Sequence, residues 1–462
     1  MDSVLKLVYD NWTDAGFPLP NGRHPVINHW LRADIKSNSR ETWSHSQNVI
    51  SEHVQGNCFM FDHSNFWTYF KRYHNRQDFV RVEQVTDDDS VYVWPIEIRT
   101  GVESVSATHR FTLSGKTTEY SIKDTINPLL LQLMQRGRVK IAINYAHDPA
   151  DNMNSIKAIE TYFDAIGVDG SNIVFIPGND CSQEYKQYFP EGKLQISATK
   201  LLMGQQLASD ILTFPRETTL GYVSDIVRAT DLDYSKTRSK RFLCFNRTMR
   251  PHRYILGYIA LKLNLLDTSI FSFLNKFDHT TSTVKGEIKS FGFTDGSKFA
   301  QAVYDLIPYE LDTQHLSQHE RQGFNSVNSK QSWFSDTYVH ITSETRFIHG
   351  ETPFVSEKTW KPIANLQPFI MVGNYGTLAY LKQLGFKTFS PFIDESYDDE
   401  TDYKQRISKI YDEIARLNAM PLHQLHDWYY SITEILLHNQ QLLIDMGSIN
   451  PYEETFTYLK GN

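Results

Sequence analysis

Seven cationic side chains and no acidic one lie between residues 236 and 253, in the sequence KTRSKRFLCFNRTMRPHR. Arg247, Arg250 and Arg253 follow an apolar run typical of a buried strand, and the proline among them marks a helix start. Because a helix N-terminus adds unpaired N–H groups and a positive dipole end, these three arginines could hold a phosphate or diphosphate. The alternative is a solvated basic face, which we expect for Lys236 to Arg241.

A second polar cluster lies further along the chain. Ser343 and Glu344 follow another strand pattern, and Ser356 is a good N-cap that places Glu357 and Lys358 in the first turn of a helix. Glutamate complements the dipole there, whereas lysine is better explained by an anionic partner. A carboxylate can bind sugar hydroxyls and an ammonium can neutralise a phosphate, so the cluster suits a nucleotide-sugar donor. The alternative is a capping arrangement with an incidental lysine.

Familiar catalytic motifs are missing. The sequence has no G-x-x-x-x-G-K-[ST], G-x-G-x-x-G, G-x-S-x-G or H-E-x-x-H, so the common ATPase, dinucleotide, hydrolase and zincin classes lack direct support. The cysteines form no C-x-x-C pair, and His315 and His319 lack an obvious third ligand. The acidic stretch 394–400 is expected to be a solvated loop. We therefore predict no metal site.

The composition narrows the class of protein. Of 462 residues, 22% are charged and 13% aromatic, and the net charge is -8. This charge gives no general basic field for nucleic acid, while the aromatic content suits sites that stack rings or sugar faces. No apolar run approaches the roughly 18 residues of a spanning helix, and no secretory leader is apparent. We expect a cytoplasmic protein without a membrane span.

Alternating strand and helix patterns predict an α/β fold. The first unit has strands at 139–145 and 173–176 around a helix at 153–166, which implies parallel pairing. A second series follows a connector at 215–240 and is interrupted by a polar segment at 282–332. Its strands are expected at 241–245, 269–273, 337–342, 369–372 and 387–389, with helices at 251–263, from 357, and at 377–384.

The expected domains are three. Residues 1–230 form an aromatic-rich N-terminal lobe on the acceptor side, α/β from about 138. Residues 231–400 form a C-terminal Rossmann-like lobe that binds the nucleotide sugar, because ligands of open α/β sheets bind beyond the carboxyl ends of the strands. Residues 401–462 contain two amphipathic helices that brace the lobes.

The runs KRFLCFNRTMRPHRYILGYI, YVHITSET and FVSEKTWKPIANLQPFIMVGNYG resemble the donor-binding half of α-1,3-fucosyltransferases and related type-B glycosyltransferases. That family pattern is S-N with a later arginine, then E-N-S, then T-E-K before a helix and P-V-x-x-G. The resemblance covers about 240–376 and implies a GT-B architecture of two Rossmann-like lobes. The segment 356–373 is also similar to uncharacterised transferase-like proteins of large bacteriophages, which implies the host cytoplasm as location.

The resemblance also implies roles for residues. Asn246 corresponds to the family asparagine, Arg250 or Arg253 to the diphosphate-binding arginine, and Glu344 to the acid of E-N-S. Glu357 and Lys358 would bind the donor ribose and diphosphate, and Arg247 and Ser343 belong to the same candidate donor site. Neither S-N nor E-N-S is complete in this chain, so the sugar and the nucleotide stay open.

The function implied is a hexosyl- or pentosyltransferase that moves a sugar from a nucleoside diphosphate sugar to an acceptor hydroxyl, with inversion and without a metal or further cofactor. His147 and Asp148, just beyond the strand ending at Tyr145, are the best-placed candidates for the catalytic base. The alternative for each is an ordinary loop residue. The acceptor could be a glycan, a lipid-linked sugar, a protein or a modified base on DNA.

Two other classes remain open. A phosphotransferase-type nucleotide enzyme would use the same anion site and would need Mg²⁺. A noncatalytic carbohydrate-binding or virion structural protein would use the aromatic N-terminal region and would bind glycan without nucleotide.

Overall fold

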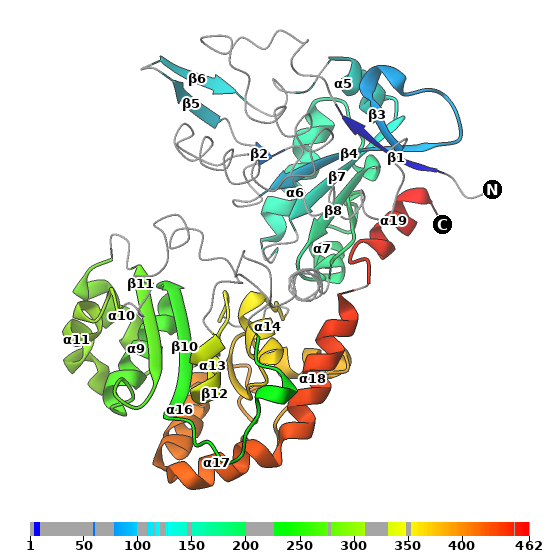
Figure 1. The fold of residues 1–462 in the computed structure, drawn as a ribbon. Helices are drawn as coiled ribbons and strands as arrows, with labels where there is room; N and C mark the ends of the chain where they lie inside the picture. The colour runs from blue at the N-terminus through cyan, green and yellow to red at the C-terminus, as the bar shows by residue number, and fades with distance from the viewer. Residues whose placement is uncertain are drawn as a thin grey trace. The chain divides into compact units, whose positions relative to one another are not determined.

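The chain divides into two compact units. Unit 1 comprises Met1–Leu202 and Asn450–Asn462, and unit 2 comprises Met203–Ile449. Each is built on a sheet of mainly parallel strands with helices around it, so the predicted α/β class is confirmed (Figure 1). The computed structural model describes residues 4–9, 59–60, 78–98, 109–113, 116–120, 126, 128–145, 150, 152–199, 226–275, 279–309, 331–347, 353–447 and 449–461.

The sheet of unit 1 has the strand order β3-β1-β4-β7-β8-β9, all parallel, and β2 pairs with β4 in the antiparallel direction. A separate antiparallel hairpin joins β5 (His109–Leu113) to β6 (Lys116–Tyr120). The strands of the large sheet are β1 (Leu5–Tyr9), β2 (Phe59–Met60), β3 (Phe79–Arg81), β4 (Val91–Ile98), β7 (Val139–Tyr145), β8 (Ile173–Pro177) and β9 (Gln195–Ile196). Its helices are α5 (Pro128–Gln135), α6 (Met153–Ala165), α7 (Ser182–Tyr188) and α19 (Glu453–Lys460).

The predicted strand-helix-strand pattern of unit 1 is confirmed as β7, α6 and β8. The apolar residues of β7 and β8 are buried on both sides, as expected for central parallel strands. Asn152 caps α6 by accepting a hydrogen bond from the Ser155 backbone N–H at 3.2 Å. Gly167 follows the helix with φ +83°, a conformation that glycine adopts without strain.

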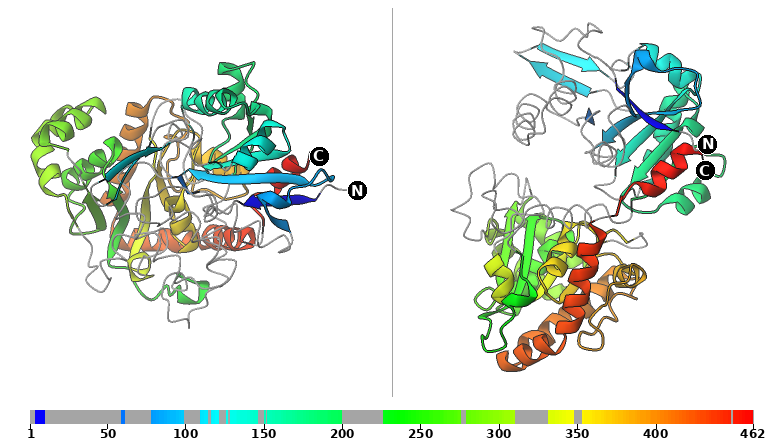
Figure 2. Two further views of the ribbon diagram at one scale, coloured as in Figure 1. Left: turned by 90° about the horizontal axis from the view of Figure 1, so that it is seen from above. Right: turned by 45° about the vertical axis from the view of Figure 1, so that its right-hand side comes forward.

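The last helix of the chain completes unit 1. Tyr452, Phe456 and Leu459 pack on one face of the sheet, against a group of apolar residues from its strands: Leu5, Leu7, Val93, Ala142, Val174 and Ile176. The Lys140 ammonium donates to the carbonyl of Leu459 at 3.1 Å near the end of α19. Figure 2 shows α19 beside the first strand, so the two ends of the chain lie close together.

The sheet of unit 2 has the order β11-β10-β12-β13, with all strands parallel. They are β10 (Lys240–Thr248), β11 (Ile270–Asn275), β12 (Thr337–Ser343) and β13 (Phe369–Val372), as the sequence predicts. The chain therefore adds β11 on one side of β10 and then crosses to the other side to form β12. The reversal point, where such sheets bind ligands, lies between the carboxyl ends of β10 and β12.

The helices of unit 2 include some that the sequence prediction missed. The sequence analysis assigns no helix to the polar segment at 282–332, yet α10 and α11 lie within or across it. The helices are α9 (Pro251–Lys262), α10 (Thr281–Ser290), α11 (Ala300–Asp305), α13 (Gln331–Ser335), α14 (Glu357–Ala364), α15 (Thr377–Gln383), α16 (Tyr403–Ala419), α17 (Leu422–Ser431) and α18 (Thr433–Met446). The tail thus holds four helices, α16 to α19, where the sequence indicates two.

The predicted strand at 387–389 is wrong. Instead of a neighbouring strand, side chains satisfy its backbone: Asn439 accepts from the Lys387 N–H at 2.8 Å and donates to the Lys387 carbonyl at 2.7 Å. Glu395 accepts from the Phe389 N–H at 2.6 Å. The segment is therefore bonded to a helix and a loop rather than to the sheet.

The predicted solvated basic face at 236–241 is only partly correct. Arg238 is 7% exposed and donates to the carbonyls of Phe334 and Thr337, and its guanidinium lies 4.0 Å from the centroid of the Tyr429 ring. It ties α17 to the start of β12.

Among the described residues, no helix is long and apolar enough to cross a membrane.

Candidate anion-binding site

Two helices begin where β10 and β12 end. Helix α9 starts at Pro251, three residues after β10, with Arg250 as its N-cap. Helix α14 starts at Glu357 with Ser356 as its N-cap, and its first turn is bonded to the residue that follows β12. The residues predicted to bind the sugar donor come from both parts of the sequence and gather at the reversal point of the sheet. Helix N-termini favour negative charge there.

Arg253 joins the carboxyl ends of the two strands. It is 3% exposed, and its Nη1 donates to the Thr248 carbonyl at 2.6 Å. Its Nε donates to Ser343 Oγ at 3.1 Å, and its Nη2 donates to the carbonyls of Ser343 and Glu344 at 3.2 and 3.1 Å. Since the guanidinium bonds protein groups on all sides, its role in this structure is to hold the framework of the site.

Glu344 attaches α14 to the end of β12. Its carboxylate is buried and accepts four hydrogen bonds from protein groups. Oε1 accepts from Ser356 N at 3.0 Å and Thr359 Oγ1 at 2.6 Å, and Oε2 accepts from Ser356 Oγ at 2.6 Å and Thr345 N at 3.1 Å. These bonds use about all the lone-pair sites of a carboxylate. Glu344 therefore positions the first turn of α14, together with the buried Ser343.

The remaining predicted donor residues form a more accessible layer. Glu357 and Lys358 form an ion pair at 2.7 Å with side chains 23% and 24% exposed, and Lys358 Nζ also donates to Ser356 Oγ at 3.2 Å. Arg250 is half-buried and Arg247 is exposed. The eight predicted donor residues thus separate into an inner layer of Asn246, Arg253, Ser343 and Glu344 and an outer layer of Arg247, Arg250, Glu357 and Lys358.

The electrostatics of the site follow from burial beside several cations. Burial, and then the charge of Arg253, lowers the pKa of His252 well below 6.5, so the ring is neutral. Because its Nε2 lies 3.0 Å from the Glu344 carbonyl, this nitrogen carries the proton and donates. Burial, and then Arg250, lowers the pKa of Arg253 to about 10. Burial raises the pKa of Glu357, but Lys358 outweighs it and the pKa falls to about 2.

Positive charge is in excess at this place. The interacting groups are four cations and two carboxylates, namely Arg250, Arg253, Lys358, Lys361, Glu344 and Glu357. Among these six residues the cations outnumber the carboxylates by two. Asn246, which is fully buried, has an Oδ1 with no hydrogen-bond partner in the described part of the chain. An anionic ligand with additional hydroxyl groups matches both features.

Sequence reasoning missed three members of the cluster. His252 and Thr359 complete the bonding around Glu344, and Lys361 adds a cation one turn beyond Lys358. The spacing of Lys361, three residues after Lys358 on a helix, was a signal available in the sequence. The bonds of His252 and Thr359 depend on how α9 and α14 meet, which no local pattern specifies.

The candidate catalytic residues His147 and Asp148 lie outside the described residues, as do His315 and His319 and part of the 215–240 connector. The described residues on either side of the first pair are held by contacts within unit 1. Before it, Tyr145 stacks on Phe175 with centroids 6.1 Å apart. After it, Asn179 accepts from the Ala150 N–H at 2.7 Å and donates to the Ala150 carbonyl at 3.4 Å. Their assignment as a base stays a prediction.

Comparisons with known proteins add no relative. No protein-family model matches the chain, and no curated protein matches it significantly. The function must therefore be argued from the site itself.

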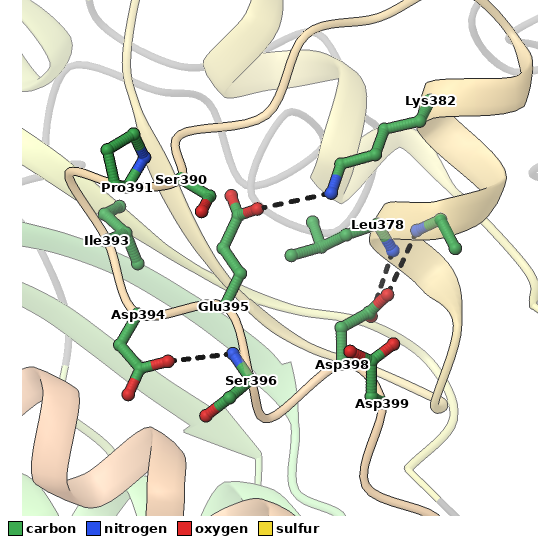
Figure 3. Close-up of a pocket in the computed structure, with 11 residues that line it drawn as sticks. Leu378, Lys382, Ser390, Pro391, Ile393, Asp394, Glu395, Ser396, Asp398 and Asp399 are labelled. Carbon is green, nitrogen blue, oxygen red and sulfur yellow. Dashed lines mark hydrogen bonds and ion pairs between the residues drawn. The ribbon is translucent and has the colours of Figure 1, made fainter.

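A cavity of about 450 Å³ lies between α15 and the acidic loop at 390–399 (Figure 3). Asp398 accepts from the N–H groups of Leu378 and Ala379, both at 3.0 Å. Glu395 accepts from Thr388 Oγ1 at 2.7 Å and lies 3.6 Å from the Lys382 ammonium. The prediction of a solvated loop is wrong for these two buried carboxylates, which hold the loop to the helix. In the described part of the chain, no three His, Cys, Asp or Glu residues could hold a metal ion.

Proposed function

We propose that the protein is a glycosyltransferase with GT-B architecture, and that unit 2 binds the diphosphate of a nucleoside diphosphate sugar at the carboxyl ends of β10 and β12. The observation that carries the proposal is the gathering of four cations, which outnumber the two carboxylates among them, at the reversal point of a parallel sheet beside the first turns of α9 and α14. The resemblance of the same residues to the donor site of α-1,3-fucosyltransferases supports this choice among nucleotide-binding functions.

In this proposal the two layers of the site have different tasks. The inner residues Arg253 and Glu344 keep the strand ends and α14 in place through hydrogen bonds with protein groups. The outer residues Arg250 and Lys358 contact the phosphates. Such contacts gain strength as the sugar leaves, because negative charge then develops on the diphosphate. In the proposal Glu357 accepts hydrogen bonds from ribose hydroxyls and remains paired with Lys358.

The reaction proposed is a single displacement. An acceptor oxygen forms a bond to the anomeric carbon of the sugar, and the bond from that carbon to the diphosphate oxygen breaks. The hydroxyl proton passes to a base, for which His147 and Asp148 of unit 1 remain the candidates. The departing diphosphate keeps the bonding electron pair, and its charge is met by the cations of unit 2. Inversion at the anomeric carbon and independence of metal are parts of this proposal.

The test is a calorimetric titration with UDP, GDP, CDP, ADP and their sugar conjugates, in Mg²⁺ and in EDTA. We expect one diphosphate series to bind, and Lys358→Met to weaken it about tenfold, as loss of one charged hydrogen bond implies. The matched control is Lys289→Met, an exposed lysine at the end of α10. Absence of binding across the panel, or equal binding by both variants, would refute the site.

A catalytic readout completes the test. The nucleotide sugar that binds is incubated with a panel of glycan, lipid-linked, protein and DNA acceptors, and release of free nucleoside diphosphate is followed. Transfer to one acceptor class supports the transferase. Binding of the diphosphate, with turnover only of a nucleoside triphosphate and Mg²⁺, would instead indicate the phosphotransferase.

A further inference from the structure

Lys361 is a cation of the site that lies one helical turn beyond Lys358 on α14. Its side chain is half-buried, and its ammonium lies 5.5 Å from the centroid of the Phe245 ring, near the carboxyl end of β10. Among the described residues, no acceptor or carboxylate lies within bonding distance of this ammonium. A half-buried ammonium that rests only on an aromatic face retains its capacity to donate hydrogen bonds.

The surroundings of Lys361 make this charge costly without an anion. Burial lowers its pKa to about 8, and the attraction of Glu357 is offset in part by the repulsion of Lys358. Both of these charged groups lie on its own helix. The titratable group nearby on β12 is His340. Burial, and then the charge of Lys361, lowers the pKa of His340 to about 3, so its ring is neutral.

His340 provides a second, independent observation at the same place. It is 2% exposed, its Nδ1 bonds Thr342 Oγ1 at 2.9 Å, and its Nε2 has no hydrogen-bond partner in the described part of the chain. Its ring packs edge-on against Phe245, with centroids 5.8 Å apart. An ammonium and an imidazole nitrogen, neither of which bonds a described residue, therefore flank the same aromatic ring.

Phe245 and the exposed Arg247 lie on one side of β10, since they are two residues apart in a strand. Asn246 lies on the other side, facing the same way as Ser343, which bonds Arg253. The α14 side of β10 is thus a second face of the site, distinct from the side held by Arg253. Of the predicted site residues on β10, Arg247 lies on this face and Asn246 on the other, while Glu357 and Lys358 belong to α14 itself.

We propose that Lys361 is a second phosphate ligand, which binds the donor diphosphate over the face of Phe245 while Lys358 binds it from the preceding turn. This inference rests on the proposed binding of a diphosphate and adds to it a residue and a direction of approach. Two ammonium groups one turn apart would hold the two phosphates of one ligand.

The proposal predicts a pH dependence that belongs to Lys361 alone. The ammonium form binds the anion, and this form is lost as the pH rises through about 8. The other cations of the site still attract the anion, so that binding weakens without disappearing. An arginine at 361 would keep its charge at every pH used, because its pKa is far higher.

The test uses the full chain and inorganic diphosphate, titrated between about pH 6.5 and pH 9.5. Wild type is compared with Lys361→Met, Lys361→Arg and the control Lys289→Met at each pH, so that ionisation of the ligand cancels in the ratio. We expect Lys361→Met to bind about tenfold more weakly at pH 6.5 and nearly equally at pH 9.5. Lys361→Arg should match wild type at pH 6.5 and exceed it at pH 9.5.

If wild type and Lys361→Met bind diphosphate with equal dissociation constants at every pH, the role of Lys361 is overturned and the proposed function stays intact. A constant ratio that does not change with pH would also overturn it, because a structural effect of the substitution does not follow the titration of a lysine. Wild-type protein that binds no diphosphate at any pH would overturn both proposals.

Discussion

The sheets of units 1 and 2 share a strand order and differ at the carboxyl ends of their strands. In each sheet the first strand lies between the next two parallel strands along the chain: β1 lies between β3 and β4, and β10 lies between β11 and β12. In unit 2 the strand ends carry the cluster around Arg253 and Glu344. In unit 1 the described ends of β7 and β8 are Tyr145 and Pro177. Strand order thus sets where a ligand can enter, and the side chains decide whether it is an anion.

The units also differ in how their sheets are covered. The helices on the sheet of unit 2 come from its own continuous stretch of chain, with α18 packed on α14 through Gln440, which donates to the Ala364 carbonyl at 2.7 Å. One face of the sheet in unit 1 is covered by α19, from the far end of the chain. Unit 1 therefore depends on a segment that is far from the rest of it in sequence, whereas the anion site of unit 2 does not.

The largest expected effect is on the stability of unit 1, which depends on the packing of α19. Phe456→Ala should destabilise unit 1 by about 4 kcal/mol, because it opens a cavity in the core between α19 and the sheet. Unit 2 should be unaffected. Pulse proteolysis in urea, with the fragments assigned by mass spectrometry, measures the two units separately. Tyr458→Ala on the same helix is the control, since Tyr458 is 41% exposed; equal loss in both variants would contradict the packing described.

The next effect tests the inner layer of the site in unit 2. Arg253→Ala should destabilise unit 2 by about 3 kcal/mol, because it removes the guanidinium that donates to the carbonyls of Thr248 and Ser343 and one of the two donors to the Glu344 carbonyl. Arg247→Ala, which removes an exposed arginine, should change the stability by less than about 0.5 kcal/mol. Urea unfolding of both variants measures the difference. Two variants of similar stability would show that Arg253 does not join the strands.

The smallest effect separates the units by pH. His252 and His340 are buried in unit 2 with lowered pKa values, so the unfolded chain binds protons below pH 6.5 that the folded unit does not. Stability of unit 2 should therefore fall as the pH falls below 6.5, by up to about 1.4 kcal/mol per pH unit for each histidine. His340→Gln should remove the part of this pH dependence of stability that comes from His340.

Unit 1 should respond to acid later. Burial raises the pKa of Glu160, but hydrogen bonds from Tyr185 OH and the Lys193 N–H outweigh it and lower the pKa below 4.5. The stability this carboxylate contributes is present above pH 4.5 and is lost as the pH falls further. Urea titrations between pH 7.5 and about pH 4 test which unit loses stability first as the pH falls. Loss of unit 1 before unit 2 on acidification would contradict it.

Much of the fold could be predicted because its central strands are local apolar runs. The bounds of β7 and β13 match the predicted ones, since such runs between breakers have few alternatives. The segment 387–389 has the same composition as a strand, but Asn439 and Glu395 take the place of a neighbouring strand. A pattern in sequence reports the apolar face of a segment and not the identity of its hydrogen-bond partner.

The candidate site could be predicted as a set of residues but not as two layers. The order of the motifs placed Arg253 and Glu344 beside Glu357 and Lys358, which the structure brings together. The sequence assigned all of them to the ligand, because a charged residue near a helix start suits both a ligand and a neighbouring strand end. Only the partners of each side chain distinguish these roles, and those depend on the packing of α9 and α14.

The central claim is that a diphosphate binds at the carboxyl ends of β10 and β12. Hydrogen–deuterium exchange of the full chain, with and without the nucleoside diphosphate that binds, tests it most directly because exchange reports position. We predict slower exchange in peptides covering 246–254 and 355–361, the starts of α9 and α14, and loss of this protection in Lys358→Met. Protection confined to other segments, or unchanged in Lys358→Met, would contradict the account.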